Sequence, residues 1–195
     1  ALALALAQYA RCEQPAADEP CAQCRNCRKA EKLIHPDLHF AFPTVETNGT
    51  SDALLPQWRS ALLDNPYLDV NHWLQLIGAE NRQGNINKEE CVRIVHKLSL
   101  KTFEADRKVL VMWLPEYLGK EGNRLLKIIE EPPENTLFIL VAEEPERILN
   151  TILSRCQIIK VHPLADEAVV AGLQQLKNVP AAQAEAIAYL ANGNF

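Results

Sequence analysis

Two uninterrupted apolar runs constrain the fold of this chain of 195 residues more than any other feature of its sequence. Residues 108–114 have the sequence KVLVMWL, and residues 136–142 have the sequence TLFILVA. A strand buried on both faces of a parallel sheet is apolar throughout, whereas a half-buried strand alternates apolar and polar residues. Between the runs, residues 120–131 carry apolar side chains at helical spacing until Pro132 and Pro133 end the helix. The order strand, helix, strand predicts an α/β fold with a parallel sheet flanked by helices.

Further elements are predicted on either side of these runs. Shorter apolar stretches predict strands at residues 37–42 and 157–161. A helix is expected to begin after Asn87, an N-cap residue followed by Glu90 at the spacing of a capping box. The side chains expected on the buried face of that helix are Cys91, Val95 and Leu98. The other expected helices cover residues 1–12, 22–35, 145–154, 165–177 and 181–191, with short helices between 54 and 73 and loops at 13–20, 43–52 and 81–85.

The composition excludes several classes of protein. The chain has 20 basic and 25 acidic residues. This slightly acidic balance argues against a protein that binds nucleic-acid phosphates over its whole surface. Hydrophobic residues make up 48% of the sequence, which is enough to form a core, and no apolar run reaches the roughly 18 residues that a membrane span needs. The tryptophans at 58, 73 and 113 are widely spaced, which favours core packing over stacking on bases.

Four of the six cysteines cluster near the N-terminus. Cys12, Cys21, Cys24 and Cys27 form the pattern C-x8-C-x2-C-x2-C. Steps of three residues advance by about 300° around a helix, so the last three can share one face, and Cys12 can supply a fourth ligand from the end of the preceding helix. The pattern favours a structural zinc ion, because four sulfur ligands leave no position for an activated water. Two disulfides, or thiols without a role, are the alternatives.

The other cysteines and the nearby histidines are not expected to bind metal. Cys91 and Cys156 stand alone in the sequence, which is typical of small buried hydrophobic residues. His35 and His39 have the i, i+4 spacing of a helical metal site, but Pro36 lies between them, so we expect core or surface histidines. The basic residues that can offset the charge of about -2 on a zinc tetrathiolate are Arg11, Arg25, Arg28 and Lys29.

The start of the chain does not resemble a secretion signal. Residues 1–7 are apolar but lack the preceding basic stretch and the cleavage site of a signal peptide. A cysteine cluster in a chain with a real core and no such signal favours a reducing compartment, so we expect a cytoplasmic protein. Because the sequence begins without Met, we expect it to be the ordered part of a longer chain.

Three stretches carry a family resemblance when they are taken together. The first is the cysteine pattern, which lies between an N-terminal helix and the sequence HPDLHFAFP at residues 35–43. The second is KEGNRLLKIIEEPPE at residues 120–134, and the third is TILSRC at residues 151–156. The combination resembles bacterial DNA polymerase III clamp-loader subunits of the delta-prime or gamma/tau type, and the resemblance covers nearly the whole chain.

This resemblance implies the AAA+ fold, a parallel P-loop-type sheet of five strands followed by a helical lid. Residues 1–162 would form the ATPase-like core with an inserted zinc module at residues 12–27, and residues 163–195 would begin the lid. The family's phosphate loop and central strand would precede Ala1, and its collar domain would follow Phe195.

The departures from the family pattern bear on activity. In motor subunits the first apolar run ends in Asp-Glu, which hold Mg²⁺ and orient the attacking water. Those places fall at Trp113 and Leu114, which have no oxygen ligand, and Glu116 is offset by several Å. The polar sensor residue after the second run is replaced near Ala142 and Glu143. We therefore expect little ATP hydrolysis or none by this chain, and ATP binding is left open.

Arg155 is retained from the family pattern. Without the resemblance, the alternative is a structural arginine that pairs with a carboxylate or with a helix C-terminus. In the family, the Arg of Ser-Arg-Cys reaches the ATP of a neighbouring subunit, and a guanidinium suits this role because it is planar, charged and bidentate. The resemblance thus implies a non-hydrolysing delta-prime-like subunit of the DNA polymerase III holoenzyme. Its partners would be gamma/tau and delta subunits, and through them the sliding clamp and primed DNA.

Two alternatives remain at this stage. One is an active gamma/tau-type ATPase in which Glu116 or another acidic residue takes the place of the missing Asp-Glu pair. The other is a zinc-ribbon module that binds nucleic acid through the basic cluster beside the cysteines, which contains Arg25, Arg28, Lys29 and Lys32.

Overall fold

The computed structural model describes residues 1–45, 49–79, 82–191 and 193. Within these residues the sheet has three parallel strands in the order β1–β2–β3. Leu38 pairs with Val109 across the first ladder, and Lys108 pairs with Thr136 across the second. The bounds of the strands are Leu38–Ala41 for β1, Lys108–Trp113 for β2 and Thr136–Val141 for β3. The predicted α/β class with a parallel sheet is confirmed.

The strand expected at residues 157–161 was wrongly predicted. This segment has no regular structure, and its apolar side chains are largely exposed, with Ile159 at 69% and Val161 at 74% of their full accessibility. An apolar sequence favours a strand only where a neighbouring strand supplies hydrogen-bond partners, and the described residues place none beside it.

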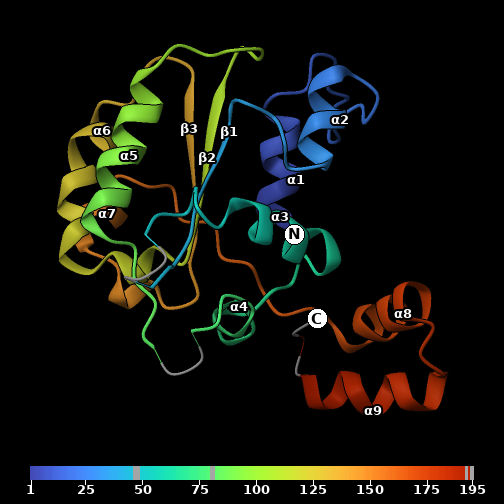
Figure 1. Cartoon of the computed structure of the whole chain (residues 1–195). Helices are drawn as coiled ribbons and strands as arrows, with labels where there is room; N and C mark the ends of the chain where they lie inside the picture. The colour runs from blue at the N-terminus through green and yellow to red at the C-terminus, as the bar shows by residue number, and fades with distance from the viewer. Residues whose placement is uncertain (46–48, 80–81, 192, 194–195) are drawn as a thin grey trace. The chain divides into compact units, whose positions relative to one another are not determined.

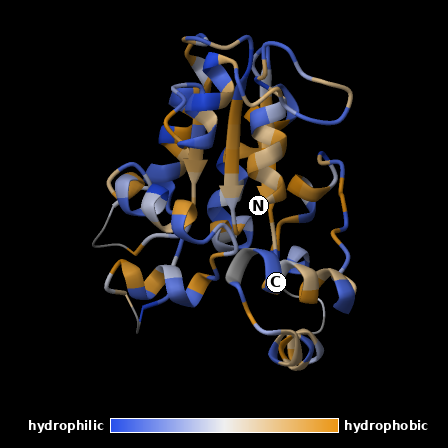
Figure 2. Cartoon of the chain, turned by 90° about the vertical axis from the view of Figure 1, so that its right-hand side faces the viewer, coloured by the Kyte–Doolittle hydropathy of each residue, from blue (hydrophilic) through white to orange (hydrophobic). Residues whose placement is uncertain are grey.

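Alternate residues of β2 point to opposite faces of the sheet and build two apolar layers. Val109, Val111 and Trp113 belong to the layer under α1, α3 and α4, whereas Leu110 and Met112 belong to the layer under α5, η2, α6 and α7. Figure 1 shows α5, α6 and α7 on one side of the sheet and α1 and α3 on the other. Apolar residues follow the strands through the centre of the molecule (Figure 2). The helix bounds in these layers are α1 Leu2–Tyr9, α3 Leu55–Asp64, α4 Val70–Leu76, α5 Lys88–Ser99, η2 Pro115–Leu125, α6 Leu126–Glu130 and α7 Asn150–Leu153.

The three tryptophans meet in the core although they are far apart in the sequence. Trp58 stacks on Phe42 with ring centroids 4.1 Å apart, and it lies 5.0 Å from both Trp73 and Trp113. The indole N–H of Trp73 donates to the carbonyl of Pro43 at 2.8 Å. The prediction that the tryptophans pack in the core is confirmed.

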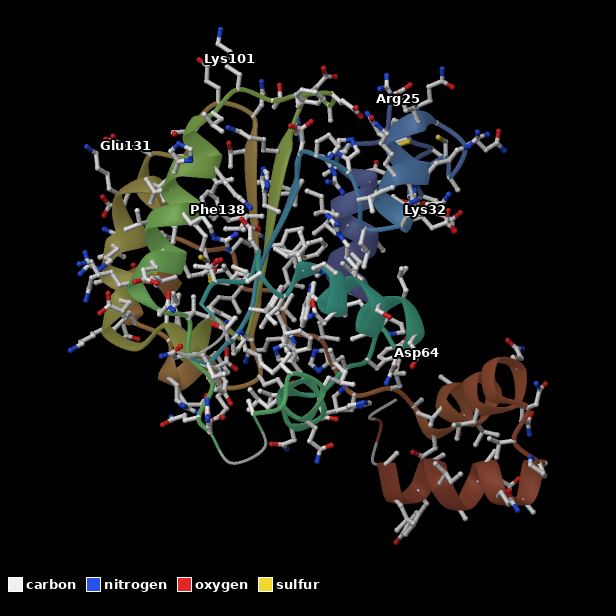
Figure 3. All side chains as sticks on the ribbon, viewed as in Figure 1. Arg25, Lys32, Asp64, Lys101, Glu131 and Phe138 are labelled. Atoms are coloured by element: carbon white, nitrogen blue, oxygen red, sulfur yellow. The ribbon has the colours of Figure 1, made fainter. Side chains whose placement is uncertain are left out.

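Phe138 belongs to the apolar layer on the opposite face of the sheet and lies toward α5 in Figure 3.

Helix α5 begins as predicted, and Cys91 and Leu98, two of the three side chains expected on its buried face, are buried. The Asn87 side chain accepts the Glu90 N–H at 2.9 Å, so the N-cap is confirmed. The Glu90 carboxylate does not complete a capping box; it accepts the Ser51 N–H at 2.7 Å. Ile94 is buried at the place expected for Val95, which is exposed.

Several predicted helices are shorter or tighter than expected. The helix expected at 22–35 is α2, Arg25–Glu31, which is followed by Leu33 in a left-handed conformation. The helix expected at 120–131 is the 3₁₀ segment η2 followed by the short helix α6, and Gly119 has φ of 50° inside η2. Residues 145–154 form the 3₁₀ turn η3, Pro145–Arg147, and the short helix α7. The loops expected at 43–52 and 81–85 lie partly outside the described residues.

The chain divides into two compact units, Ala1–Gln157 and Ile158–Phe195. The second unit contains α8, Asp166–Lys177, and α9, Ala181–Ala191, which pack against each other. Among the described helices, none combines the length and the hydropathy required for a membrane span.

Candidate functional site

The four clustered cysteines converge on one point. One sulfur from each of Cys12, Cys21, Cys24 and Cys27 lies within 4.8 Å of the other three, and the sulfurs of Cys21 and Cys27 are 3.9 Å apart. Tetrahedral Zn–S bonds of about 2.3 Å place sulfurs roughly 3.8 Å apart, so the set fits a zinc ion. All six cysteines lie in the described residues and all are free, so the disulfide alternative is not the arrangement present.

Backbone hydrogen bonds orient these sulfurs. The N–H groups of Cys21 and Cys24 donate to the sulfurs of Cys12 and Cys21 at 3.2 and 3.3 Å. The Cys24 sulfur caps α2 by accepting the Cys27 N–H at 3.3 Å. Cys12 lies in the turn after α1, where its N–H bonds to the carbonyl of Tyr9. The loop and the first turn of α2 therefore hold the cluster together before any metal binds.

Two of the thiols have pKa values shifted in opposite directions. The pKa of Cys21 is lowered to about 6, chiefly because its sulfur accepts the backbone N–H groups of Cys24 and Gln23. Burial and hydrogen bonding to neighbouring thiols raise the pKa of Cys27 to about 12. Metal ligation requires thiolates, so Cys21 is ready to bind at neutral pH, whereas Cys27 ionises only with the help of a cation.

Arg11 is a buried cation beside this cluster. The residue is only 3% exposed, and its Nε donates to the carbonyl of Ala7 at 2.9 Å. Both terminal nitrogens, Nη1 and Nη2, are buried without a hydrogen-bond partner among the described residues. Burial lowers the pKa of Arg11 to about 10, while the negative charges of Asp37 and Cys27 act in the opposite direction.

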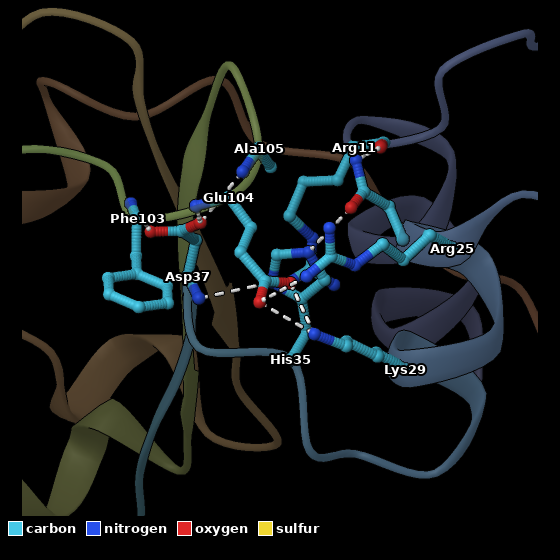
Figure 4. A network of polar contacts seen from close by, with 9 residues as sticks. Arg11, Arg25, Lys29, His35, Asp37, Phe103, Glu104 and Ala105 are labelled. Carbon is cyan, nitrogen blue, oxygen red and sulfur yellow. Dashed lines mark hydrogen bonds and ion pairs between the residues drawn. The ribbon is translucent and has the colours of Figure 1, made fainter.

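A polar network joins α2 to the loop that precedes β2 (Figure 4). The Asp37 carboxylate accepts the backbone N–H groups of Phe103, Glu104 and Ala105 at 2.7, 2.8 and 2.9 Å. Lys29 of α2 donates to the Glu104 carboxylate at 2.5 Å, and Arg25 does so at 3.1 Å. The basic cluster considered for nucleic-acid binding is therefore partly neutralised within the chain.

His35 is a core residue and His39 is half-buried, whereas core or surface positions were expected for both. His35 is 1% exposed; its Nδ1 accepts the Asp37 N–H at 3.0 Å, so its Nε2 carries the proton that faces the Asn26 amide oxygen. Burial lowers the pKa of His39 to about 4. Neither histidine joins the metal-compatible group, which consists of the four cysteines. Cys91 is buried as expected, whereas Cys156 is only partly buried.

At the end of β2, among the described residues, Glu116 is the nearest acid in sequence, and it is 4% exposed with its Oε2 buried and without a hydrogen-bond partner. Trp113 and Leu114 are 9% and 1% exposed within an apolar layer, and Leu114 has a left-handed backbone with φ of 57°. The Glu116 side chain turns back into the molecule, where one oxygen accepts the N–H groups of Glu143 and Glu144 at 2.9 and 3.1 Å. Glu116 thus fastens the segment after β3 to the segment after β2.

Arg155 lies in the turn after α7, on the surface. One terminal nitrogen donates to the Thr151 carbonyl at 2.6 Å and to the Ser154 hydroxyl at 3.2 Å. The other forms an ion pair with Glu130 at the end of α6. Its side chain is 35% exposed, so the guanidinium is accessible but already paired within its own chain.

Sequence reasoning missed Asn26, Asp37, Glu104 and Glu130. The contacts of Asp37 and Glu104 join residues 66 to 79 positions apart, and spacing within a segment carries no signal for them.

Comparison with known proteins places this geometry in context. Residues 1–165 match the protein family described as "DNA polymerase III, delta subunit". A protein named DNA polymerase III subunit delta' from Bacillus subtilis (strain 168) is 29% identical over 168 residues, which are 86% of this chain and 39% of that protein. The protein of the same name from Haemophilus influenzae is 33% identical over 154 residues, which are 79% of this chain and 36% of the relative. DNA polymerase III subunit tau from Escherichia coli (strain K12) is 29% identical over 177 residues, 91% of this chain and 22% of its own length. The chain spans about two fifths of the length of these delta' relatives.

Proposed function

The chain belongs to the DNA polymerase III delta subunit family, and from that premise we propose that it is part of a delta-prime-type clamp-loader subunit that does not itself hydrolyse ATP. The parallel sheet with helices on both faces is consistent with an AAA+-like core. The partners we propose are gamma/tau and delta subunits, and through them the sliding clamp and primed DNA. A reducing cytoplasmic setting fits a cluster of free thiols.

The observation that carries the proposal is the chemistry at the end of β2. Phosphoryl transfer requires acidic side chains that bind Mg²⁺ and orient water at this place in the sheet. Here Trp113 and Leu114 are buried in an apolar layer. Glu116 is 4% exposed, and its Oε1 is held by two backbone N–H groups while its Oε2 is buried without a partner among the described residues, so its carboxylate is enclosed rather than open to Mg²⁺.

We propose that Arg155 acts on ATP bound by a neighbouring subunit. Its surface location after α7 and its exposed guanidinium support this role, because a cation that acts on another subunit must be accessible. Ser154 accepts a hydrogen bond from the guanidinium and helps to set its direction. The Glu130 ion pair must open before Arg155 can contact another subunit's phosphate.

We propose a structural role for the cysteine cluster. Four thiolates would hold zinc, which would fix the loop at residues 12–24 onto the start of α2 and leave no ligand position for catalysis. One zinc per chain, released only on denaturation, is the result that metal analysis should give.

The test of the proposed function compares ATP turnover by the full-length protein alone and in the assembled ring. We expect the isolated protein to be inactive, and we expect Arg155→Ala to lower turnover by the ring by about 10³-fold or more at the site it serves, without loss of assembly. Steady turnover by the isolated protein would favour the alternative of a gamma/tau-type motor. An unchanged rate in the Arg155→Ala ring would refute the finger assignment.

The nucleic-acid-binding alternative makes a separate prediction. A zinc-ribbon module would bind DNA by itself, with an affinity that falls steeply as salt increases. The ion pairs of Arg25 and Lys29 with Glu104 reduce the positive charge available for this binding.

A further inference from the structure

Glu116 is a buried carboxylate for which the function described so far has no use. It is 4% exposed, and its Oε2 has no hydrogen-bond partner among the described residues. Burial of a carboxylate is costly unless hydrogen bonds compensate for the lost hydration. Its Oε1 accepts the backbone N–H groups of Glu143 and Glu144 at 2.9 and 3.1 Å. An apolar side chain would fill this place at lower cost but could not accept these groups, so what Glu116 contributes is its hold on the segment after β3.

The segment held in this way leads to Arg155 through two consecutive turns. Glu144 begins the 3₁₀ turn η3, and its carbonyl accepts the Arg147 N–H at 3.0 Å. At the start of α7, the Leu149 carbonyl accepts the Ile152 N–H at 2.8 Å. The Ile152 carbonyl in turn accepts the Arg155 N–H at 3.0 Å. A displacement at the start of η3 is therefore passed along the backbone that carries the guanidinium.

The 3₁₀ segment η2 holds the same stretch of chain at a second place. Gly122 of η2 is buried, and a Cβ atom added to it would lie 3.0 Å from Cδ1 of Ile152 and 3.2 Å from Cδ1 of Leu149. The backbone of η2 thus approaches α7 more closely than a larger residue would allow without a shift of these side chains. The Arg147 guanidinium also lies over the Tyr117 ring, 5.6 Å from its centroid. The chain after β2 therefore contacts both η3 and α7.

We propose that Glu116 is a positioning residue that, together with Gly122, sets the place from which Arg155 reaches the nucleotide of a neighbouring subunit. This role rests on the function proposed for Arg155. Glu116 fixes the start of η3 through hydrogen bonds, and Gly122 fixes α7 through close packing. Accurate placement matters, because a displacement of about 1 Å at a reacting centre can cost about 10²-fold in rate.

The experiment compares two substitutions of Glu116 in the full-length protein, assembled into the ring. Glu116→Ala removes the acceptor of both N–H groups, so ATP turnover at the site that Arg155 serves should fall about 10- to 100-fold. The ATP concentration that gives half the maximal rate should change less, by about twofold at most, because the lost interaction acts in the transition state. Glu116→Gln keeps an acceptor oxygen and should retain about half of the rate or more. Glu146→Ala, at an exposed acid of η3, is the matched control and should leave turnover unchanged.

Hydrogen exchange in the isolated full-length protein gives a measurement that does not depend on ATP. The amides of Glu143 and Glu144 should exchange about tenfold or more faster in Glu116→Ala, and at nearly the original rate in Glu116→Gln. Unchanged exchange in Glu116→Ala would overturn the inference, because the carboxylate would then not hold this segment. Gly122→Ala is the second variant. It leaves these hydrogen bonds in place but requires α7 to shift, so it should lower ring turnover about two- to tenfold.

A role in placing Arg155 also predicts that the effects are not additive. In a ring that already carries Arg155→Ala, Glu116→Ala should lower turnover no further. Equal losses with and without Arg155 would overturn the inference, as would a loss in Glu116→Gln as large as in Glu116→Ala. Full turnover in Glu116→Ala would also overturn it, and where that variant does not assemble, full turnover in Gly122→Ala decides in the same way.

The failure of this role is distinguishable from failure of the proposed function. A slow Arg155→Ala ring beside a fast Glu116→Ala ring refutes the positioning role alone. Unchanged turnover in Arg155→Ala refutes the finger assignment and the positioning role with it.

Discussion

Arg155 is held by its own chain in this structure. The ion pair with Glu130 occupies one side of the guanidinium, and the Thr151 carbonyl occupies another. An ion pair this exposed contributes at most about 1 kcal/mol, so it can bias the arginine without locking it. In the role proposed for Arg155, Glu130 and a neighbouring subunit's phosphate would compete for the guanidinium.

Removing this competitor should favour contact with the neighbouring subunit. We expect Glu130→Gln to raise ATP turnover by the assembled ring about two- to fivefold, with the effect shrinking as salt screens the pair. The measurement is steady-state turnover at two salt concentrations, with Glu131→Gln as the control one residue away. A rate that stays the same or falls would mean that Glu130 does not compete with the phosphate.

Functional residues could be predicted from the sequence only where their spacing along the chain indicates that their side chains lie together. The four cysteines could be found from their steps of three residues, because adjacent turns bring such side chains together. The partners Asn26 and Asp37 gave no local signal, since Asn26 bonds to His35 and Asp37 bonds to Ala105, which lie in other segments of the chain.

At the scale of elements, Asp37, the residue before β1, connects the start of that strand to the loop before β2. Burial acts to raise the pKa of Asp37, but the backbone N–H groups of Ala105, Glu104 and Phe103 outweigh it and leave this pKa below the usual 3.8. The stabilisation is therefore complete above about pH 4 and is lost as the pH falls through the lower pKa of the folded state.

We expect Asp37→Asn to lower the free energy of unfolding by about 1–3 kcal/mol at pH 7, because the Asn NH₂ group cannot accept, so at least one of the three bonds is lost and the others become neutral. Urea unfolding followed by tryptophan fluorescence measures the difference. The gap between the variant and the unaltered protein should narrow below pH 4. The exposed Asp106 lies in the same loop, and Asp106→Asn should change little. A gap that is independent of pH would contradict the role of the charge.

A helix or strand could be predicted where the sequence of that segment alone indicates its secondary structure. The runs of β2 and β3 could be predicted because burial on both faces makes the whole strand apolar. The strand expected at residues 157–161 failed because strand formation depends on a pairing partner as well as on sequence. Helix lengths were overestimated where the backbone tightens into 3₁₀ geometry, as in η2.

At the scale of the larger unit, the cysteine cluster is connected through a series of polar contacts to the loop before β2. α2 begins at the cysteines, and its Lys29 bonds to Glu104 beside the backbone groups that Asp37 holds. Loss of metal should therefore loosen more than the cysteine loop, because α2 supports the loop before β2 from one side.

Hydrogen exchange provides the measurement of this coupling in the full-length protein. In protein prepared without zinc, we expect exchange about tenfold or more faster than in protein prepared with zinc at Cys24 and Cys27 and at the amides of residues 103–105. Amides in the β2–β3 ladder should exchange equally in both preparations. Acceleration confined to residues 12–27 would show that the metal centre and the sheet are independent.

The left-handed turn at Leu114 has a consequence for how this lineage can change. A glutamate restored at that place alone would lie in a site that is 1% exposed, where desolvation favours its uncharged form. The backbone there would still disfavour any side chain other than glycine by roughly 1 kcal/mol. The contact of Trp58 with Trp113 would also have to be rebuilt. An acid introduced at position 114 would therefore need accompanying changes in the turn and at Trp113 before its carboxylate could be charged and exposed.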